Sequence, residues 1–196
     1  MRFLPLERGF YGQIMDADRW CRPLRQMETA RFGTLEVAEE DVVHFPLGIP
    51  AFEDHREWVF VGEDESPVKW LQSLADGDVA LPVCPPGFVR GDYNARIPAE
   101  ELELLECEGK EDMAIFLVLS IPASSPWDMT ANLRAPIVLN HVKRLGTQVI
   151  AANDDYEVRH PVFPTEVRAR LQGASEAEER PCPLRLVGDG EAEEGA

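Results

Sequence analysis

Four side chains able to bind a cation lie close together in NDDYEVRH, at 153–160. Asp154, Asp155, Glu157 and His160 offer the oxygen and nitrogen atoms that could surround a divalent ion. Their spacing matches no known ligand loop, and a turn with exposed carboxylates explains them as well. We therefore expect no metal site and no cofactor in this chain.

Other residues with catalytic potential are isolated. Glutamates between 100 and 108 could serve as an acid and a base, but a helix with a solvated acidic face is far commoner. The four cysteines form no CxxC pair, and the chain has neither a glycine-rich phosphate loop nor a nucleophile signature. We expect a protein that is not an enzyme and whose thiols are free in a reducing cytoplasm.

The charge of the chain restricts its partners. Its 196 residues, enough for one ordinary domain, include 19 basic and 36 acidic residues, which give a net charge of −17. Direct contact with nucleic acid or an anionic membrane would begin against Coulomb repulsion. The longest apolar run, 113–119, is far shorter than the roughly 20 residues of a membrane span. We expect a protein or cationic partner, no direct nucleic acid and no membrane.

One candidate binding element is the predicted strand VKWLQSL, at 68–74, whose faces are both mixed. Here Trp70 lies close to an amide, Gln72, and a hydroxyl, Ser73. Such a composition is common at protein interfaces, because an indole ring supplies contact area while its N–H still finds a partner. A tryptophan half-buried in a barrel wall is the alternative, and it stays open.

A second candidate is DMTANLRAP, at 128–136. Asp128, Thr130 and Asn132 can bond to local backbone, and Pro136 cannot donate to a strand ladder. The strand is therefore predicted to lie at a sheet edge or to open at Pro136, and an edge with a polar loop would be available to a partner. Simple closure of a turn by these polar residues is the competing explanation.

Short strands separated by turns must position these residues. Strand-like segments run from 29 to 150, and Asp-Gly between the apolar runs 68–74 and 79–83 is a strong hairpin signal. Helical spacing predicts one helix over 97–106 and a second after Pro164, capped by Thr165. The expected fold is all-β, a small antiparallel β-barrel-like domain with one or two short helices.

Three segments are expected along the chain. Residues 1–26 are basic relative to the rest and form an N-terminal extension, residues 27–163 form the β domain, and residues 164–196 form a short helix and an acidic, disordered tail. Two interpretations of the extension stay open. Either translation naturally begins at Met27, or the extension is a real but poorly ordered arm.

Five motifs in register resemble the family of the flagellar assembly factor FliW. They are FGTLEV and DVVHFPLGIPAFED within 32–54, WLQSLADGDVAL at 70–81, MTANLRAPIVLN at 129–140, LGTQVI at 145–150 and YEVRHPV at 156–162. The resemblance implies a compact antiparallel barrel and a cytoplasmic protein without enzymatic activity. It also implies binding to newly made flagellin and, in exchange, to the translational regulator CsrA, which relieves repression of flagellin synthesis.

Two alternatives to this partner exchange remain. One is a flagellin-dedicated chaperone that binds no regulator. The other is a barrel that binds a small ligand in its interior. If Phe116, Val118 and Val138 fill that interior, no room is left for a ligand. The predicted partner-binding residues are Trp70, Gln72, Ser73, Asp128, Met129, Thr130 and Asn132.

The chain departs from the family pattern at two places. Ala51 stands where the family tends to have glycine, so a left-handed turn at this position would be strained. The segment CPPGFVRGDY, at 84–93, is richer in proline and glycine than the resemblance predicts.

Overall fold

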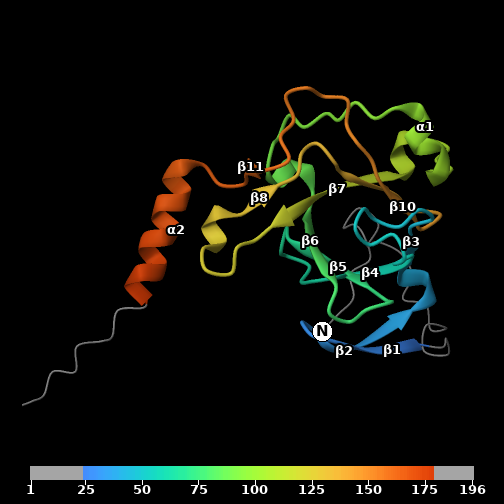
Figure 1. Cartoon of the computed structure of the whole chain (residues 1–196), viewed down its shortest axis with the longest axis horizontal. Helices are drawn as coiled ribbons and strands as arrows, with labels where there is room; N and C mark the ends of the chain where they lie inside the picture. Colours follow the sequence, from blue (N-terminus) through green and yellow to red (C-terminus); the bar gives the residue numbers. More distant parts are fainter. Residues whose placement is uncertain (1–23, 179–196) are drawn as a thin grey trace, which may run out of the picture.

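The computed structural model describes residues 24–178, with the side chains of 175–178 excepted. Most of this part of the chain is organised by strands (Figure 1). The strands are β1 (Leu24–Thr29), β2 (Gly33–Ala38), β3 (Val42–His44), β4 (Glu57–Val61), β5 (Lys69–Ser73), β6 (Ala80–Cys84), β7 (Met113–Ser120), β8 (Thr130–Ala131), β9 (Ile137–Asn140), β10 (Leu145–Gln148) and β11 (His160–Pro161). The α-helices are α1 (Ala99–Leu102) and α2 (Thr165–Glu178), and single 3₁₀ turns are η2 (Glu39–Asp41), η3 (Pro86–Phe88), η4 (Glu103–Leu105), η5 (Lys110–Asp112) and η6 (Pro126–Asp128).

Seven strands close into a barrel. They follow the order β7-β6-β5-β4-β3-β10-β9, and β9 pairs with β7 to close the ring. Every pairing is antiparallel apart from the junction of β10 and β3, where Leu145 faces His44 in a parallel pair. The predicted all-β, antiparallel barrel with short helices is therefore confirmed, including the hairpins β5–β6 and β9–β10.

The interior of the barrel is filled by large apolar side chains. Phe45 packs edge-on against Trp58, with ring centroids 6.2 Å apart, and Phe60 lies 5.0 Å from Phe116. Val138 was expected inside, but it faces the opposite way and packs with Leu105. The reason is strand alternation: in β9 the neighbours of Val138 point inward, so Val138 lies under η4.

The hairpin of β1 and β2 covers the outer face of β3, β4 and β5 (Figure 1). Leu35 and Val37 of β2 pack against Val42, Val59 and Val61. β1 begins at Leu24, three residues before the expected domain boundary at Met27, and pairs with β2 along its whole length. The expected boundary therefore falls inside a strand, while 1–23 and 179–196 lie outside the described residues.

The long strand β7 has two partners on one side. Its first half, Met113–Phe116, pairs with β9, and its last residues pair with β8. β8 pairs in turn with β11, so the stretch at Thr130 lies between two strands. The expectation of an open edge there is wrong, because β11 returns from about thirty residues further along the chain to cover it. The strand does open near Pro136, since β8 ends at Ala131 and β9 begins at Ile137.

Both expected helices differ from the structure in extent. The segment 97–106 forms only α1 and η4, and Glu106 then turns left-handed at φ 50°. α2 continues to Glu178, and the carbonyl of Pro164 accepts the amide of Arg168 at 3.0 Å, so Thr165 opens the helix and does not cap it. Within the described residues, no helix is long and apolar enough to cross a membrane.

Candidate partner-binding surfaces

Trp70 lies half-buried on the outer face of β5, beside the turn that joins β1 to β2. The ring of Phe32 meets its indole edge-on, with centroids 6.2 Å apart. The guanidinium carbon of Arg31 lies 3.8 Å from the centre of the indole ring. We name Arg31, Phe32, Trp70, Gly77 and Asp78 the Trp70 patch.

Gln72 and Ser73 do not reach the surface. Both side chains are fully buried. The Gln72 Nε2 donates to the carbonyls of Ser73, Asp76 and Val79 at 3.0, 3.1 and 3.0 Å. Strand alternation placed Gln72 on the same face as Trp70, but the turn after β5 folds over the amide. Gln72 and Ser73 were predicted to contact a partner directly. Because both are buried, they instead stabilise the hairpin from inside.

The Ser73 hydroxyl also makes its hydrogen bonds inside the protein. Its Oγ lies 2.9 Å from His55 Nδ1 and accepts the amide of Ala75 at 3.1 Å. Its hydroxyl therefore joins the loop before β4 to the end of β5.

The turn after β5 packs tightly on the turn after β1. The Ala30 amide donates to the Gly77 carbonyl at 3.1 Å, and a Cβ on Gly77 would lie 2.1 Å from the Glu28 carbonyl oxygen. Only glycine fits at this approach. A shallow pocket remains between the two turns, lined by Ala30, Arg31, Gly77, Asp78 and Ala80.

The second predicted region, which we name the Asp128 loop (residues 126–132), includes η6 and β8. Asp128 is not available as a free carboxylate, because its Oδ1 accepts from Arg168 Nη2 at 2.5 Å and from Arg168 Nε at 3.1 Å. This ion pair joins the loop to the first turn of α2. Its two side chains are each 39% exposed.

The other predicted residues of the Asp128 loop have local structural roles. Met129 is half-buried against the cluster around Leu119, and Thr130 lies in the ladder of β8. The Asn132 Oδ1 accepts the amides of Arg134 and Ala135 at 3.1 and 2.9 Å. Asn132 therefore closes a turn, while its partly exposed side chain remains at the surface.

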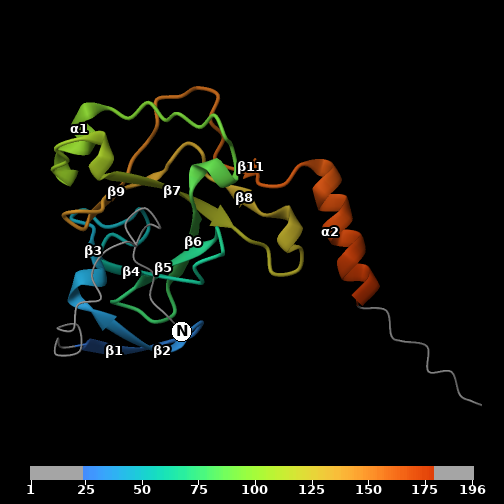
Figure 2. The same cartoon turned by 180° about the vertical axis from the view of Figure 1, so that it is seen from behind.

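The predicted residues fall into two separate groups. Trp70 packs against the cluster beneath β1 and β2, whereas Met129 packs against the cluster of β7, β8 and the segment that follows β11. Figures 1 and 2 show β8 beside α2 and β5 toward β1 and β2, at different parts of the molecule. The sequence does not reveal this separation, because the strand order is non-local.

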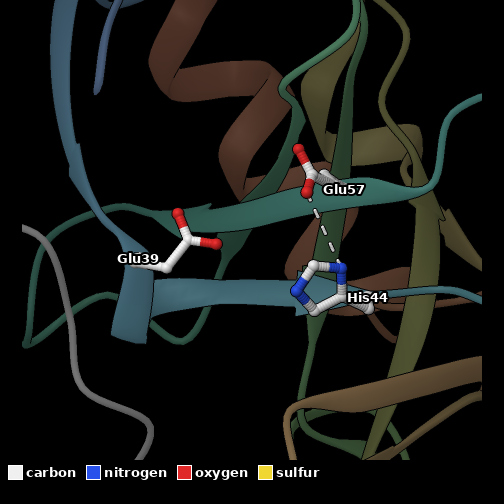
Figure 3. A group of neighbouring side chains, drawn as sticks. All are labelled: Glu39, His44 and Glu57. Carbon is white, nitrogen blue, oxygen red and sulfur yellow. Dashed lines mark ion pairs between the residues drawn. The ribbon is translucent and has the colours of Figure 1, made fainter. Parts of the chain in front are cut away.

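Glu39, His44 and Glu57 form a group that resembles a set of metal ligands (Figure 3). His44 Nδ1 lies 3.8 Å from Glu57 Oε1, although no second metal ligand stands near His44 at ligand spacing in the sequence. Arg25 already contacts both carboxylates, at 2.6 Å to Glu57 and 2.8 Å to Glu39. The hydrogen bond from Arg25 lowers the pKa of Glu57. The group is thus an ion-pair network centred on a guanidinium.

The acidic turn at 153–160 also consists of separate pairs. Asp155 lies 3.4 Å from Arg90 Nη1, and Glu157 lies 3.4 Å from His160. Arg90 also stacks over the ring of Tyr156, 5.2 Å from its centre. This arrangement fixes the turn against the loop after β6, and its carboxylates do not converge on one point.

The two described cysteines are unsuited to nucleophilic chemistry. Cys84 is fully buried, and burial raises the pKa of its thiol to about 12. Burial also raises the pKa of the half-buried Cys107. Because the thiolate is the reactive form, neither side chain is activated.

Comparison with known proteins decides the family. The model of the FliW protein family matches residues 26–162. The flagellar assembly factor FliW of Thermotoga maritima is 44% identical over 131 residues, covering 66% of this chain and 88% of the relative. The chain belongs to the FliW family. A FliW relative from Caldanaerobacter subterraneus subsp. tengcongensis is 37% identical over 140 residues, covering 70% of this chain and 93% of the relative.

A solved FliW structure has the same fold. The crystal structure of a flagellar assembly factor FliW matches with a TM-score of 0.68 and 34% identity, covering 72% of this chain and 99% of that one. The match to the FliW model ends at 162, before α2 begins at Thr165. The helix and the Arg168 contact therefore lie outside the part of the chain that defines the family.

Sequence reasoning missed Arg31 and Arg168 in these FliW surfaces. Arg31 lies in a turn, and its contact with Trp70 depends on the β1–β2 hairpin folding onto β5. Arg168 reaches Asp128 across forty positions of sequence. No local motif signals either contact.

Proposed function

We propose that this chain is a cytoplasmic flagellar assembly factor that binds flagellin and, by exchange, antagonises the translational regulator CsrA. The observation that carries the proposal is the 44% identity to a flagellar assembly factor FliW, covering 88% of that relative. The two partners are those that the family resemblance implies. Release from flagellin would free the chain to bind the regulator and relieve repression of flagellin synthesis.

The surface that best suits a protein partner is the Trp70 patch. Trp70 is half-buried, so it can supply further contact area without leaving its packing against Phe32. The backbone beneath it is held by hydrogen bonds from Gln72 Nε2 to carbonyls of Ser73 and of the turn after β5. A preformed surface loses less side-chain and loop freedom on binding.

The Asp128 loop is a second candidate surface. Met129, Thr130 and Asn132 are each partly exposed, and a partner could contact their outer atoms without breaking the turn. The charge of −17 also favours association with a protein that carries a basic, RNA-binding surface.

Isothermal titration against flagellin and CsrA tests the proposal. Trp70→Ala should weaken at least one complex by about 2 kcal/mol, and Asn132→Ala should weaken one of them, both with native circular dichroism. Trp70 also packs against Phe32 inside the protein. Trp70→Phe keeps an aromatic ring in this packing, so it separates the loss of contact with the partner from a loss of folding stability. Phe88→Ala is the matched control, since Phe88 is an aromatic residue 38% exposed at η3.

The outcomes distinguish the alternatives. Binding to flagellin alone would indicate a dedicated chaperone without a regulator. Wild-type protein that binds neither partner would refute the proposal, and unchanged affinities in both the Trp70 and the Asn132 variants would refute the surfaces. The ligand-barrel alternative is disfavoured by an interior filled with aromatic and aliphatic side chains.

A further inference from the structure

The guanidinium of Arg31 lies over the ring of Trp70. Its guanidinium carbon lies 3.8 Å from the ring centre, and the residue is exposed. Stacking uses the face of a guanidinium and leaves the N–H groups at its edge free to donate in its plane. The Arg31 donors are therefore oriented before any partner arrives.

A second arginine in the same molecule lies over an aromatic ring and also has hydrogen-bond acceptors for its N–H groups. Arg90 stacks over Tyr156 and also bonds to Asp92 at 2.9 Å and Asp155 at 3.4 Å. Within residues 24–178, Arg31 forms no ion pair, although the chain has 36 acidic residues. Arg31 therefore lies over an aromatic ring as Arg90 does, but it has no ion pair with a carboxylate within the described residues.

The space beside Arg31 suits an extended peptide. The shallow pocket next to it is lined by the small residues Ala30, Gly77 and Ala80, with Asp78 at its side. Its two walls are joined by the hydrogen bond from Ala30 to Gly77, so the pocket is preformed. Asp78 repels every carboxylate that enters the pocket, and contact with Arg31 can compensate this repulsion for one carboxylate only. The pocket therefore favours a partner segment with one acid flanked by uncharged residues.

We propose that the Trp70 patch receives a peptide segment of the partner that carries a single carboxylate, bound in bidentate fashion by Arg31. This inference rests on the proposed function and names the chemistry recognised at one of its surfaces. Arg31 fixes the carboxylate, the pocket holds the neighbouring small or apolar side chain, and Trp70 keeps the guanidinium in place.

A titration that needs no protein partner tests the site directly. The probe is the capped peptide acetyl-Ala-Glu-Ala-Leu-amide, followed through the Arg31 Nε–H and Trp70 Nε1–H signals in NMR spectra of the whole chain. The peptide should shift both signals, and the matched peptide with glutamine should not. Equal shifts with both peptides, or no shift up to millimolar concentration, would overturn the proposal.

A second measurement asks whether the proposed flagellin complex uses the site. Arg31→Gln should weaken flagellin binding about tenfold, because a hydrogen-bonded charged group is lost. Arg31→Lys should restore only part of it, since an ammonium cannot bind a carboxylate in bidentate fashion. Lys110→Gln, which removes one positive charge from exposed η5, should have no effect.

The two measurements separate this inference from the function on which it rests. Flagellin that binds wild type and Arg31→Gln equally would overturn the carboxylate site while leaving the function intact. If wild type binds no flagellin, the function fails, and the peptide titration alone decides whether the site exists.

Discussion

Ala51 holds a backbone conformation that side chains rarely adopt. Its φ is 73°, and its amide donates to the Glu53 carboxylate at 3.0 Å. A left-handed backbone is costly for any residue with a Cβ, and the departure from glycine predicted this strain at the residue scale. The bond to Glu53 helps to hold the turn, and the same contact lowers the pKa of that carboxyl.

Ala51→Gly should therefore stabilise the protein. Removing the Cβ relieves the left-handed strain, and we expect the free energy of unfolding to rise by about 1 kcal/mol, or Tm by roughly 2–4 °C. Thermal unfolding checks this directly. Ala152→Gly, at an exposed loop position, is the control and should give no gain. A lower Tm for Ala51→Gly would show that the turn is not strained.

At the residue scale, the sequence predicts the local hydrogen bonds and backbone strain of a residue better than it predicts whether the side chain is exposed to a partner. The turn chemistry of Asn132 and the strain at Ala51 follow from neighbours in the chain. The burial of Gln72 and the pairing of Asp128 do not, since each depends on a segment that folds back from elsewhere. A polar residue on a strand face can thus be mistaken for a contact residue.

At the element scale, β1 sets where the domain begins. A chain starting at Met27 loses three of the six register pairs of β1, together with the contacts of Arg25 with Glu57 and Glu39. Its Tm should lie a few degrees below that of a chain starting at Leu24. The sequence alone predicts that all of residues 1–26 are dispensable for folding. Because β1 begins at Leu24, we now expect this only of the residues before Leu24, so the Leu24 chain should match the full chain. Equal Tm values for the two shortened chains would contradict this role of β1.

The helix α2 is attached to the barrel through its first turn. An isolated helix of 14 residues is only marginally stable in water, and residues 169–174 of α2 are all exposed to solvent. Arg168→Ala should therefore speed amide hydrogen exchange in α2 about fivefold, with the free energy of unfolding of the barrel changed by less than about 0.5 kcal/mol. Arg170→Ala, on the same helix, is the matched control. Unchanged exchange in the Arg168 variant would show that the ion pair does not hold the helix.

Hairpins were the elements that the sequence predicted best. Asp-Gly between the apolar runs of β5 and β6 specifies a turn from adjacent residues alone. The covered edge at β8 and the short α1 could not be predicted in the same way. Strand β11 covers β8 from a distant segment, and the helical pattern at 97–106 also satisfies a single turn that packs Leu105 inside.

At the scale of the whole molecule, we expect net charge to control how fast the chain associates with a partner. A charge of −17 should steer the chain toward a basic partner, so its association rate with CsrA should fall as salt rises. Between 0.1 M and 1 M salt the Debye length falls from about 10 Å to about 3 Å, and stopped-flow rates should drop at least tenfold. A rate independent of salt would show that shape alone guides this encounter.

Partner exchange is the central claim, and one competition experiment tests it most directly. The preformed complex of the whole chain with fluorescently labelled CsrA is titrated with flagellin, while the binding of CsrA to flagellin mRNA is followed. We predict that flagellin releases CsrA in proportion to the complex it forms, and that RNA binding recovers to the same extent. A stable complex of all three proteins, or RNA binding that does not change on adding flagellin, would contradict the account.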